Sequence, residues 1–295
     1  MTIPQTGPWS DLSRPPLREA ALRAALTGGP EPAWRALEIT PRTGSTNADL
    51  AERARAGEPA GLVLGTDDQV AGRGRLSRQW SAPPRSSVAV SVLLRPVAPV
   101  ERWGWLPLLA GVAVVRALTT LCGLPAVLKW PNDVLVPEPG SGRELSKVCG
   151  ILAEVVTEPP GSAGSAVVLG AGINVSQERD ELPVPQATSL RLAGAATIDR
   201  DTVLRTYLRE LSRAWAGWEA AGGRPRESGL GAAYREACTT IGRRVELHLP
   251  GRAPLTGLAD GVDDAGRLQV LDDAGRQHLL AAGDVVHVRP EGGAG

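Results

Sequence analysis

Short apolar segments follow one another through the middle of the sequence and restrict its fold. Most are rich in Val, Leu or Ile and are bounded by Gly, Pro, Asp or Ser, as strands between turns are. These predicted strands are residues 61–66, 86–95, 126–130, 133–136, 148–156 and 166–175. A buried helix is predicted over 106–121, and amphipathic helices over 201–219 and 230–239. We therefore expect an α+β fold, a mixed sheet with flanking helices, rather than a doubly wound sheet.

The pattern changes after Gly242, where five shorter strand-like segments occur at close spacing. The tetrapeptide DDAG occurs twice there, at 263–266 and 272–275, and its Asp and Gly favour tight hairpin turns. Short strands at close spacing, joined by tight turns, predict a small β-barrel. We expect a large domain over 37–241 and a barrel domain over 242–291.

Residues 1–36 precede the large domain and contain one helical pattern, LREAALRAAL, which closes at Gly28 and Gly29. This N-terminal arm is too short for a helix-turn-helix module. Basic and acidic residues balance at 32 each, so no overall field attracts nucleic acid or an anionic membrane. Both observations argue against a dedicated DNA-binding protein.

The sequence favours a reduced, cytoplasmic protein. Its N-terminus lacks a basic segment followed by an apolar run, and the most apolar stretch, 103–115, is shorter than a membrane span requires. Three scattered cysteines form no CxxC pair, which indicates neither a disulfide framework nor a structural zinc site. All three histidines lie beyond residue 242, so the large domain has no Ser-His or Cys-His pair.

The most informative segment is DQVAGRGRLSRQW, residues 68–80. Gly72 and Gly74 allow the backbone to approach an anion, and the arginines between and after them can bind phosphate or carboxylate through two hydrogen bonds. Trp80 offers a face to a purine or an arginine. Taken alone, the segment also fits a surface loop or a nonspecific nucleic-acid patch. It is neither a Walker A loop nor a dinucleotide fingerprint.

Three further motifs are weak when taken singly. KWPND (129–133) fits an ordinary turn between two strands, and Lys147 at the start of a strand fits a solvated lysine. Gly150 inside that strand predicts that another group packs against the backbone. GSTN (44–47) is explained by helix capping through Ser45 or Thr46.

In combination and in order, these motifs resemble the biotin–protein ligase family. GSTN, DQVAGRGRLSRQW, KWPND, KVCGIL (147–152) and GAGIN (170–174) stand in that family's order and at compatible spacing, and the resemblance covers roughly 37–290. The sequence departs from the family pattern at Leu76-Ser77, where the loop is often more basic, and at Cys149. The resemblance implies a class II synthetase-like catalytic domain with a C-terminal SH3-like barrel.

The resemblance also implies the reaction. Family members use ATP and Mg²⁺ to convert the biotin carboxylate to biotinyl-5′-AMP, and then transfer biotin to a lysine of a biotin carboxyl carrier protein domain. Because the first step brings a carboxylate against a polyphosphate, catalysis requires positioning and charge neutralisation rather than histidine.

The family's functional residues carry over to matching positions of this sequence. Lys147 and Arg73 are the expected catalytic residues. The expected biotin-binding residues are Ser45, Thr46, Asn47, Gln69, Arg73, Lys147 and Gly150. The expected nucleotide-binding residues are Arg75, Arg78, Trp80, Asn132 and Asn174. Asp133 is the expected metal ligand.

Three alternatives remain open. A lipoate or octanoate ligase shares the fold and the acyl-adenylate logic, but an apolar lipoyl ring needs no partners such as Ser45, Thr46 and Gln69. A biotin-sensing repressor would need a DNA-binding domain, which the short arm disfavours. A generic RNA-binding module leaves KWPND and Lys147 unexplained. We expect no DNA or membrane partner, and the resemblance leaves a homodimer open.

Overall fold

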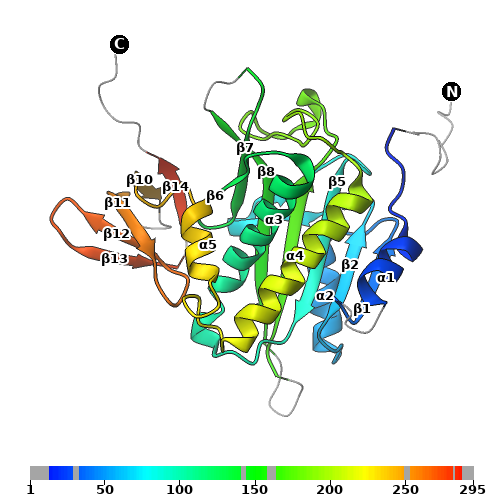
Figure 1. Ribbon diagram of the computed structural model, residues 1–295, viewed down its shortest axis with the longest axis horizontal. Coiled ribbons are helices and arrows are strands. Elements are labelled where there is room, and N and C mark those ends of the chain that lie inside the picture. The colour runs from blue at the N-terminus through cyan, green and yellow to red at the C-terminus, as the bar shows by residue number, and fades with distance from the viewer. Residues whose placement is uncertain are drawn as a thin grey trace.

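The larger part of the chain folds around a seven-stranded sheet with the strand order β1-β2-β5-β9-β8-β7-β6 (Figure 1). The computed structural model describes residues 13–28, 33–140, 144–157, 164–248, 253–281 and 283–287. The strands of this sheet are β1 (Ala36–Thr40), β2 (Leu62–Thr66), β5 (Ser87–Leu94), β6 (Val127–Lys129), β7 (Asp133–Pro137), β8 (Leu145–Val156) and β9 (Ala166–Asn174). The mixed sheet with flanking helices confirms the expected fold class.

Strand direction follows from the connections. β1 and β2 pair in parallel because helix α2 (Thr46–Arg55) forms the crossover between them. Ser45 caps this helix, its hydroxyl accepting a hydrogen bond from the Ala48 N–H at 3.4 Å. The other neighbouring strands of the sheet pair antiparallel. The mixed character of the sheet therefore comes from one βαβ unit at its edge.

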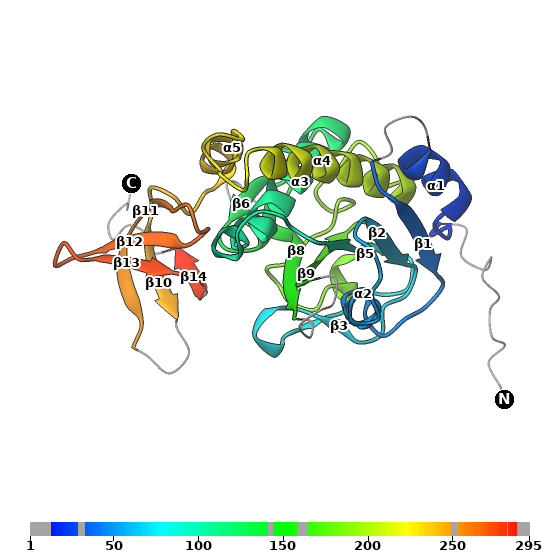
Figure 2. The ribbon, with the colours of Figure 1, turned by 90° about the horizontal axis from the view of Figure 1, so that it is seen from below.

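Helices cover both faces of the sheet. Figure 2 shows α3 (Trp105–Cys122) and α4 (Arg200–Ala220) on one face and α2 on the other. All residues of β5 and nearly all of β9 are therefore buried, which explains why these strands read as apolar runs. The short helix α1 (Glu19–Thr27) packs at the β1 edge, and α5 (Leu230–Ala237) follows α4.

Helix α3 runs to Cys122, beyond the end of the apolar stretch 103–115 noted in the sequence. Its 18 residues are long and apolar enough to cross a membrane by composition alone, with a mean hydropathy of 1.7. Most of them are instead buried between the sheet and helices α4 and α5. Helix α3 is thus the central core helix, as an evenly apolar helix in a layered domain should be.

A second, five-stranded antiparallel sheet follows, with the order β13-β12-β11-β10-β14. Its strands are β10 (Arg244–His248), β11 (Leu255–Val262), β12 (Leu268–Asp272), β13 (Gln277–Leu280) and β14 (Asp284–His287). Both DDAG segments form the predicted turns, with Gly266 and Gly275 at positive φ. One of these turns docks on the large domain, because the Trp105 indole donates a hydrogen bond to the Asp263 carbonyl at 3.0 Å.

Several short elements were not predicted from the sequence. They are strand β1 and the two-residue strands β3 (Gly72–Arg73) and β4 (Gln79–Trp80), which pair as a small hairpin within the 68–80 segment. Lys147 is the third residue of β8 rather than its first. The N-terminal helix does close at Gly28, as expected. Strands β3 and β4 have two residues each, too few to show a hydrophobic alternation, and β1 contains Glu and Thr and so lacks a continuous apolar run.

The three cysteines are free and buried, which leads to a test of the packing. Burial raises the pKa of the Cys122 thiol to about 11 and also raises the pKa of Cys149. At pH 8 the native thiols should therefore react with an aromatic disulfide reagent far more slowly than the unfolded chain does. Val97→Cys, at a side chain that is 91% exposed, is the control and should react at once. Prompt labelling of the native cysteines would contradict this packing.

Candidate functional site

A cavity of about 750 Å³ opens on the face of the sheet that carries α2. Its walls come from segments far apart in the sequence: the start of α2, the 69–81 segment, the β6–β7 hairpin and residues 183–187. Strands β5, β8 and β9 supply the floor, and β10 and β14 of the second sheet reach its rim. The large domain and the C-terminal sheet therefore both contribute to the cavity.

Small residues in register make the floor flat. Ala89 on β5 pairs with Gly172 on β9, Gly172 pairs with Gly150 on β8, and Gly150 pairs with Asp133 on β7. The Trp80 indole lies on the two glycines, since a Cβ would be 2.4 Å from its ring at Gly172 and 3.0 Å at Gly150. The prediction that a group packs against the backbone at Gly150 is correct, and that group is Trp80.

A β-bulge aims Lys147 into the cavity. β8 has one extra residue between the Val134–Cys149 and Leu135–Lys147 pairs. Side chains alternate along a strand, so Lys147 and Cys149 would otherwise face the same side. The extra residue puts Cys149 in the core and Lys147 on the side of Gly150, where a Cβ would lie 3.3 Å from the Lys147 Nζ atom.

Lys147 is held by charge and by its backbone. Its Nζ atom lies 2.6 Å from Asp133 Oδ1 and 5.9 Å from the centre of the Trp80 ring. Its backbone N–H donates to the Gln186 carbonyl at 2.7 Å, and its carbonyl accepts from Thr188 at 2.8 Å. The ammonium is thus positioned by β8, by the 186–188 segment beside it and by one carboxylate, and 32% of the side chain stays exposed for a ligand.

A chain of buried polar groups lies at the α2 end of the cavity. Gln69 Oε1 accepts from the Thr46 N–H at 3.0 Å, and the Thr46 hydroxyl lies 2.7 Å from the Ser91 hydroxyl. Ser91 donates to Asn47 Oδ1 at 2.6 Å, and Asn47 Nδ2 donates to Glu154 Oε2 at 2.7 Å. Such a chain, satisfied within the protein, presents fixed donors and acceptors to a polar ligand group.

The 68–80 segment crosses the mouth of the cavity as the β3–β4 hairpin. Arg73 lies 3.3 Å from Glu154, and Arg75 donates a long hydrogen bond of 3.4 Å to Asn132 on the opposite wall. Gly72 is required here, because a Cβ would lie 2.3 Å from the Trp80 carbonyl oxygen. Leu76 adopts a left-handed conformation, φ 53°, at the tip.

The structure brings every sequence-predicted site residue to this one cavity. They are Ser45, Thr46, Asn47, Gln69, Arg73, Arg75, Arg78, Trp80, Asn132, Asp133, Lys147, Gly150 and Asn174. Two of them direct polar groups into the protein. Ser45 caps α2, and the Asn174 amide donates to the Thr188 carbonyl at 2.9 Å while its oxygen accepts from Gln177. Gly150 makes room for Trp80 in this structure.

Sequence reasoning missed other residues of the site. Ser91 and Glu154 complete the polar chain, and Gly172 lies beneath Trp80. In the sequence, the signal for Ser91 was an isolated Ser in an apolar strand, and the signal for Gly172 was the pair of alternating glycines in GAGIN. His248, an exposed residue of β10, also lines the cavity. No local pattern could have found it, because a separate sheet carries it.

The cavity is strongly cationic. Arg73, Arg75, Arg78, Lys129 and Lys147 line it, and the last two are the sole lysines of the sequence. Within the described residues no three His, Cys, Asp or Glu side chains cluster as metal ligands do. Asp133 is the carboxylate that lines the cavity, and it is paired with Lys147. The arrangement fits an anionic ligand with one or more phosphate or carboxylate groups.

Comparison with known proteins agrees with this chemistry. A model of the biotin/lipoate A/B protein ligase family matches residues 39–174, and a model of the biotin protein ligase C terminal domain matches 240–288. The chain is 44% identical to the biotin–[acetyl-CoA-carboxylase] ligase of Mycobacterium tuberculosis, over 95% of this chain and 98% of that one. It is 32% identical to the bifunctional ligase/repressor BirA of Bacillus spizizenii, over 81% of this chain and 70% of that one.

A solved structure is similar as well. The biotin protein ligase of Aquifex aeolicus in complex with biotin and ATP superposes with a TM-score of 0.67 at 27% identity, covering 87% of this chain and all of that one. Fold and sequence together define a protein ligase of the biotin and lipoate class. The chain belongs to the biotin protein ligase family.

The glycine floor can be tested without a ligand. Gly172→Ala places a methyl group where the Trp80 ring lies, so the indole should move toward solvent and acrylamide should quench more of the tryptophan emission. Gly217→Ala is the matched control, because Gly217 lies in α4 with no atom near its Cβ position. Equal quenching in the two folded variants would show that Trp80 does not depend on the floor.

Proposed function

We propose that this protein is an ATP-dependent ligase that forms biotinyl-5′-AMP from biotin and ATP and transfers biotin to a lysine of a biotin carboxyl carrier protein domain. The observation that carries the proposal is the arrangement of the cavity. A chain of polar groups that runs from Gln69 to Glu154 lies at one end, the Lys147–Asp133 pair lies on the floor, and arginines cross the mouth. Biotin carries a polar ureido head and a carboxylate, and ATP carries a polyphosphate. The cavity offers groups that would suit these three in that order.

The biotin head would bind at the polar chain. Its ureido group has two N–H donors and one carbonyl acceptor, which suit the oxygens and amide groups of Thr46, Asn47 and Gln69 beside Ser45. Ser91, linked to both Thr46 and Asn47, would set their orientation. Donors and acceptors that are already fixed cost little ordering on binding.

Adenylate formation would depend on charge neutralisation. A biotin carboxylate oxygen attacks the α-phosphorus of ATP, a bond to phosphorus forms, and pyrophosphate leaves. Lys147 would hold the carboxylate and α-phosphate oxygens, and Arg73 would close the loop over the product. Fixed cations at this position reduce the repulsion between the two anions in the transition state.

The nucleotide would occupy the side of the cavity that faces the β6–β7 hairpin. Arg75 and Arg78 would meet the phosphates, Trp80 the adenine, and Asn132 and Asn174 the nucleotide or its supporting backbone. His248 and Val285 of the C-terminal sheet also line the cavity, so the 242–291 domain would assist the 37–241 domain in ligand binding.

Mg²⁺ would enter with ATP. It usually keeps several waters and binds one or two carboxylates together with substrate phosphates, and Asp133 fits the role of a single carboxylate ligand. Bound there, the ion would withdraw charge from the leaving pyrophosphate. Asp133 would then exchange its contact with Lys147 for the ion, which frees the ammonium for the reacting oxygens.

In the second step the carrier lysine amine attacks the anhydride carbonyl carbon, and AMP leaves with its bonding electron pair. The protein partner would be the domain that supplies this lysine, the carrier domain of an acyl-CoA carboxylase. The reaction needs no DNA or membrane partner. We place the reaction in the cytoplasm. A homodimer is compatible with the reaction but is not required by it.

The direct test is covalent transfer. Incubation with a carrier domain, biotin and MgATP should add one biotin to the carrier, seen as a mass shift. Lipoate in place of biotin should add nothing, because its ring makes no use of the polar chain. A carrier whose acceptor lysine is replaced by Arg is the control. Transfer of lipoate in preference to biotin would overturn the proposed substrate.

Lys147 can be tested in the first step alone. Lys147→Ala should lower biotin-dependent pyrophosphate exchange by ~10²-fold or more, since it removes a cation that meets developing charge. Its thermal midpoint should change little, because the side chain is partly exposed. Arg213→Ala, at an exposed α4 side chain, is the control. Exchange at the wild-type rate would remove Lys147 from the reaction.

A further inference from the structure

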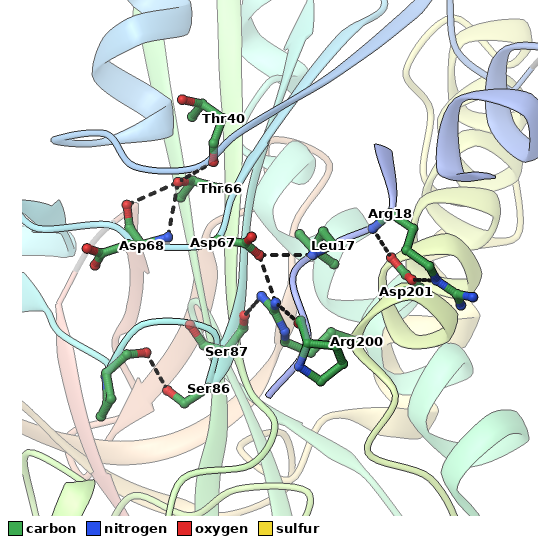
Figure 3. A network of polar contacts seen from close by, with 12 residues as sticks. Leu17, Arg18, Thr40, Thr66, Asp67, Asp68, Ser86, Ser87, Arg200 and Asp201 are labelled. Atoms are coloured by element: carbon green, nitrogen blue, oxygen red, sulfur yellow. Dashed lines mark hydrogen bonds and ion pairs between the residues drawn. The ribbon is translucent and has the colours of Figure 1, made fainter. Parts of the chain in front are cut away.

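The N-terminal arm is hydrogen-bonded to Asp67, the residue that directly precedes the 68–80 segment of the site. Figure 3 shows the Leu17 N–H and the Arg200 guanidinium meeting at Asp67 Oδ1, at 3.1 and 2.7 Å. Asp67 follows β2 directly and precedes Asp68 and Gln69, so its side chain sits where the chain turns from the sheet into the cavity wall.

Arg200 joins three segments at this point. Besides Asp67 it donates to the Pro15 carbonyl at 2.6 Å and to the Ser87 carbonyl, at the start of β5, at 3.3 Å. The ion pair is nearly inaccessible, with 5% of the Arg200 side chain and 10% of the Asp67 side chain exposed. A buried ion pair adds little net stability but imposes a defined geometry. That geometry includes the arm, which supplies one donor and one acceptor.

The arm is also bonded to the segment that leads into a second cavity wall, residues 183–187. Arg14 holds both Glu181 carboxylate oxygens, at 2.9 and 2.5 Å, and the Ser176 carbonyl at 3.0 Å. Its hydrogen bond keeps the pKa of Glu181 below the ordinary value. The same wall continues to Gln186, whose carbonyl accepts from the Lys147 N–H.

We infer that residues 14–17 act as a positioning strut of the active site, setting the 67–80 segment relative to the 176–188 segment that pairs with Lys147. Arg14, Asp67 and Arg200 are its positioning residues. The inference rests on the proposed function for its kinetic readout. Its physical basis is that residues 14–17 are bonded to the two segments that lead into these walls and do not line the cavity themselves.

Arg14→Ala is the decisive variant. It removes the hold on the 176–181 wall and leaves Glu181 its hydrogen bond from the Glu178 N–H, so no buried charge is stranded. Arg18→Ala is the matched control on the same arm, because Arg18 is exposed and pairs with Asp201 on α4 rather than with a cavity wall. Arg14→Lys restores the charge, and Asp67→Asn tests the other end of the strut.

Three quantities are measured on the full chain: the biotin KM and kcat of pyrophosphate exchange, the rate at which trypsin cuts after Arg73, Arg75 or Arg78 without ligand, and the thermal midpoint. Arg14→Ala and Asp67→Asn should raise the biotin KM about tenfold, equivalent to about 1.4 kcal/mol of lost positioning. They should also speed loop cleavage, with Arg14→Lys falling between. Arg18→Ala should match the wild type.

If Arg14→Ala and Asp67→Asn lower the thermal midpoint but keep the biotin KM and loop cleavage of Arg18→Ala, the arm is packing only and the inference is wrong. If the wild type shows no biotin-dependent exchange, the proposed function fails instead. The cleavage comparison, which needs no substrate, then still decides whether the arm positions the loop.

Discussion

The close approach of the Trp80 indole to the sheet is the constraint on which the site depends. Two glycines, Gly150 and Gly172, pair with each other across β8 and β9. A Cβ at Gly172 would overlap the ring, and a Cβ at Gly150 would crowd it. With the indole placed there, the β3–β4 hairpin crosses the cavity mouth, where Arg73 lies near Glu154 and Arg75 near Asn132. The flat backbone thus determines where the charges of the loop can lie.

Charge placement follows from this geometry. The cations that line the cavity come from the loop, the β6–β7 hairpin and β8. Three of them are held near a carboxylate or amide that a ligand could replace: Glu154 for Arg73, Asn132 for Arg75 and Asp133 for Lys147. The ligand-free site is therefore already close to the arrangement that two anions would require. Little reorganisation is then left for the reaction itself, which is the usual origin of electrostatic catalysis.

The two faces of the seven-stranded sheet differ in what they contain. The α3–α4 side of the sheet contains the main apolar core, whereas the α2 side contains the polar chain and the cavity. Ion pairs that hold the walls, Arg14–Glu181 and Arg200–Asp67, lie outside the cavity and do not compete with a ligand. The main core and the cavity thus lie on different faces, and a smaller apolar cluster beneath α2 shares the face of the cavity.

The sequence by itself determined the local features: the strand and helix order, the DDAG turns, the β6–β7 hairpin at KWPND, and the membership of Arg73, Trp80 and Lys147 in one site. These depend on neighbours along the chain or on motifs that resemble a family. Tertiary structure decided what depends on register and packing. The β8 bulge turns Lys147 away from the core, Ser91 and Glu154 complete the polar chain, and His248 and the N-terminal arm arrive from distant segments. A shift of one residue in strand register moves every side chain of that strand to the other face of the sheet. The residue pattern within one segment also contains no information on where a distant segment packs.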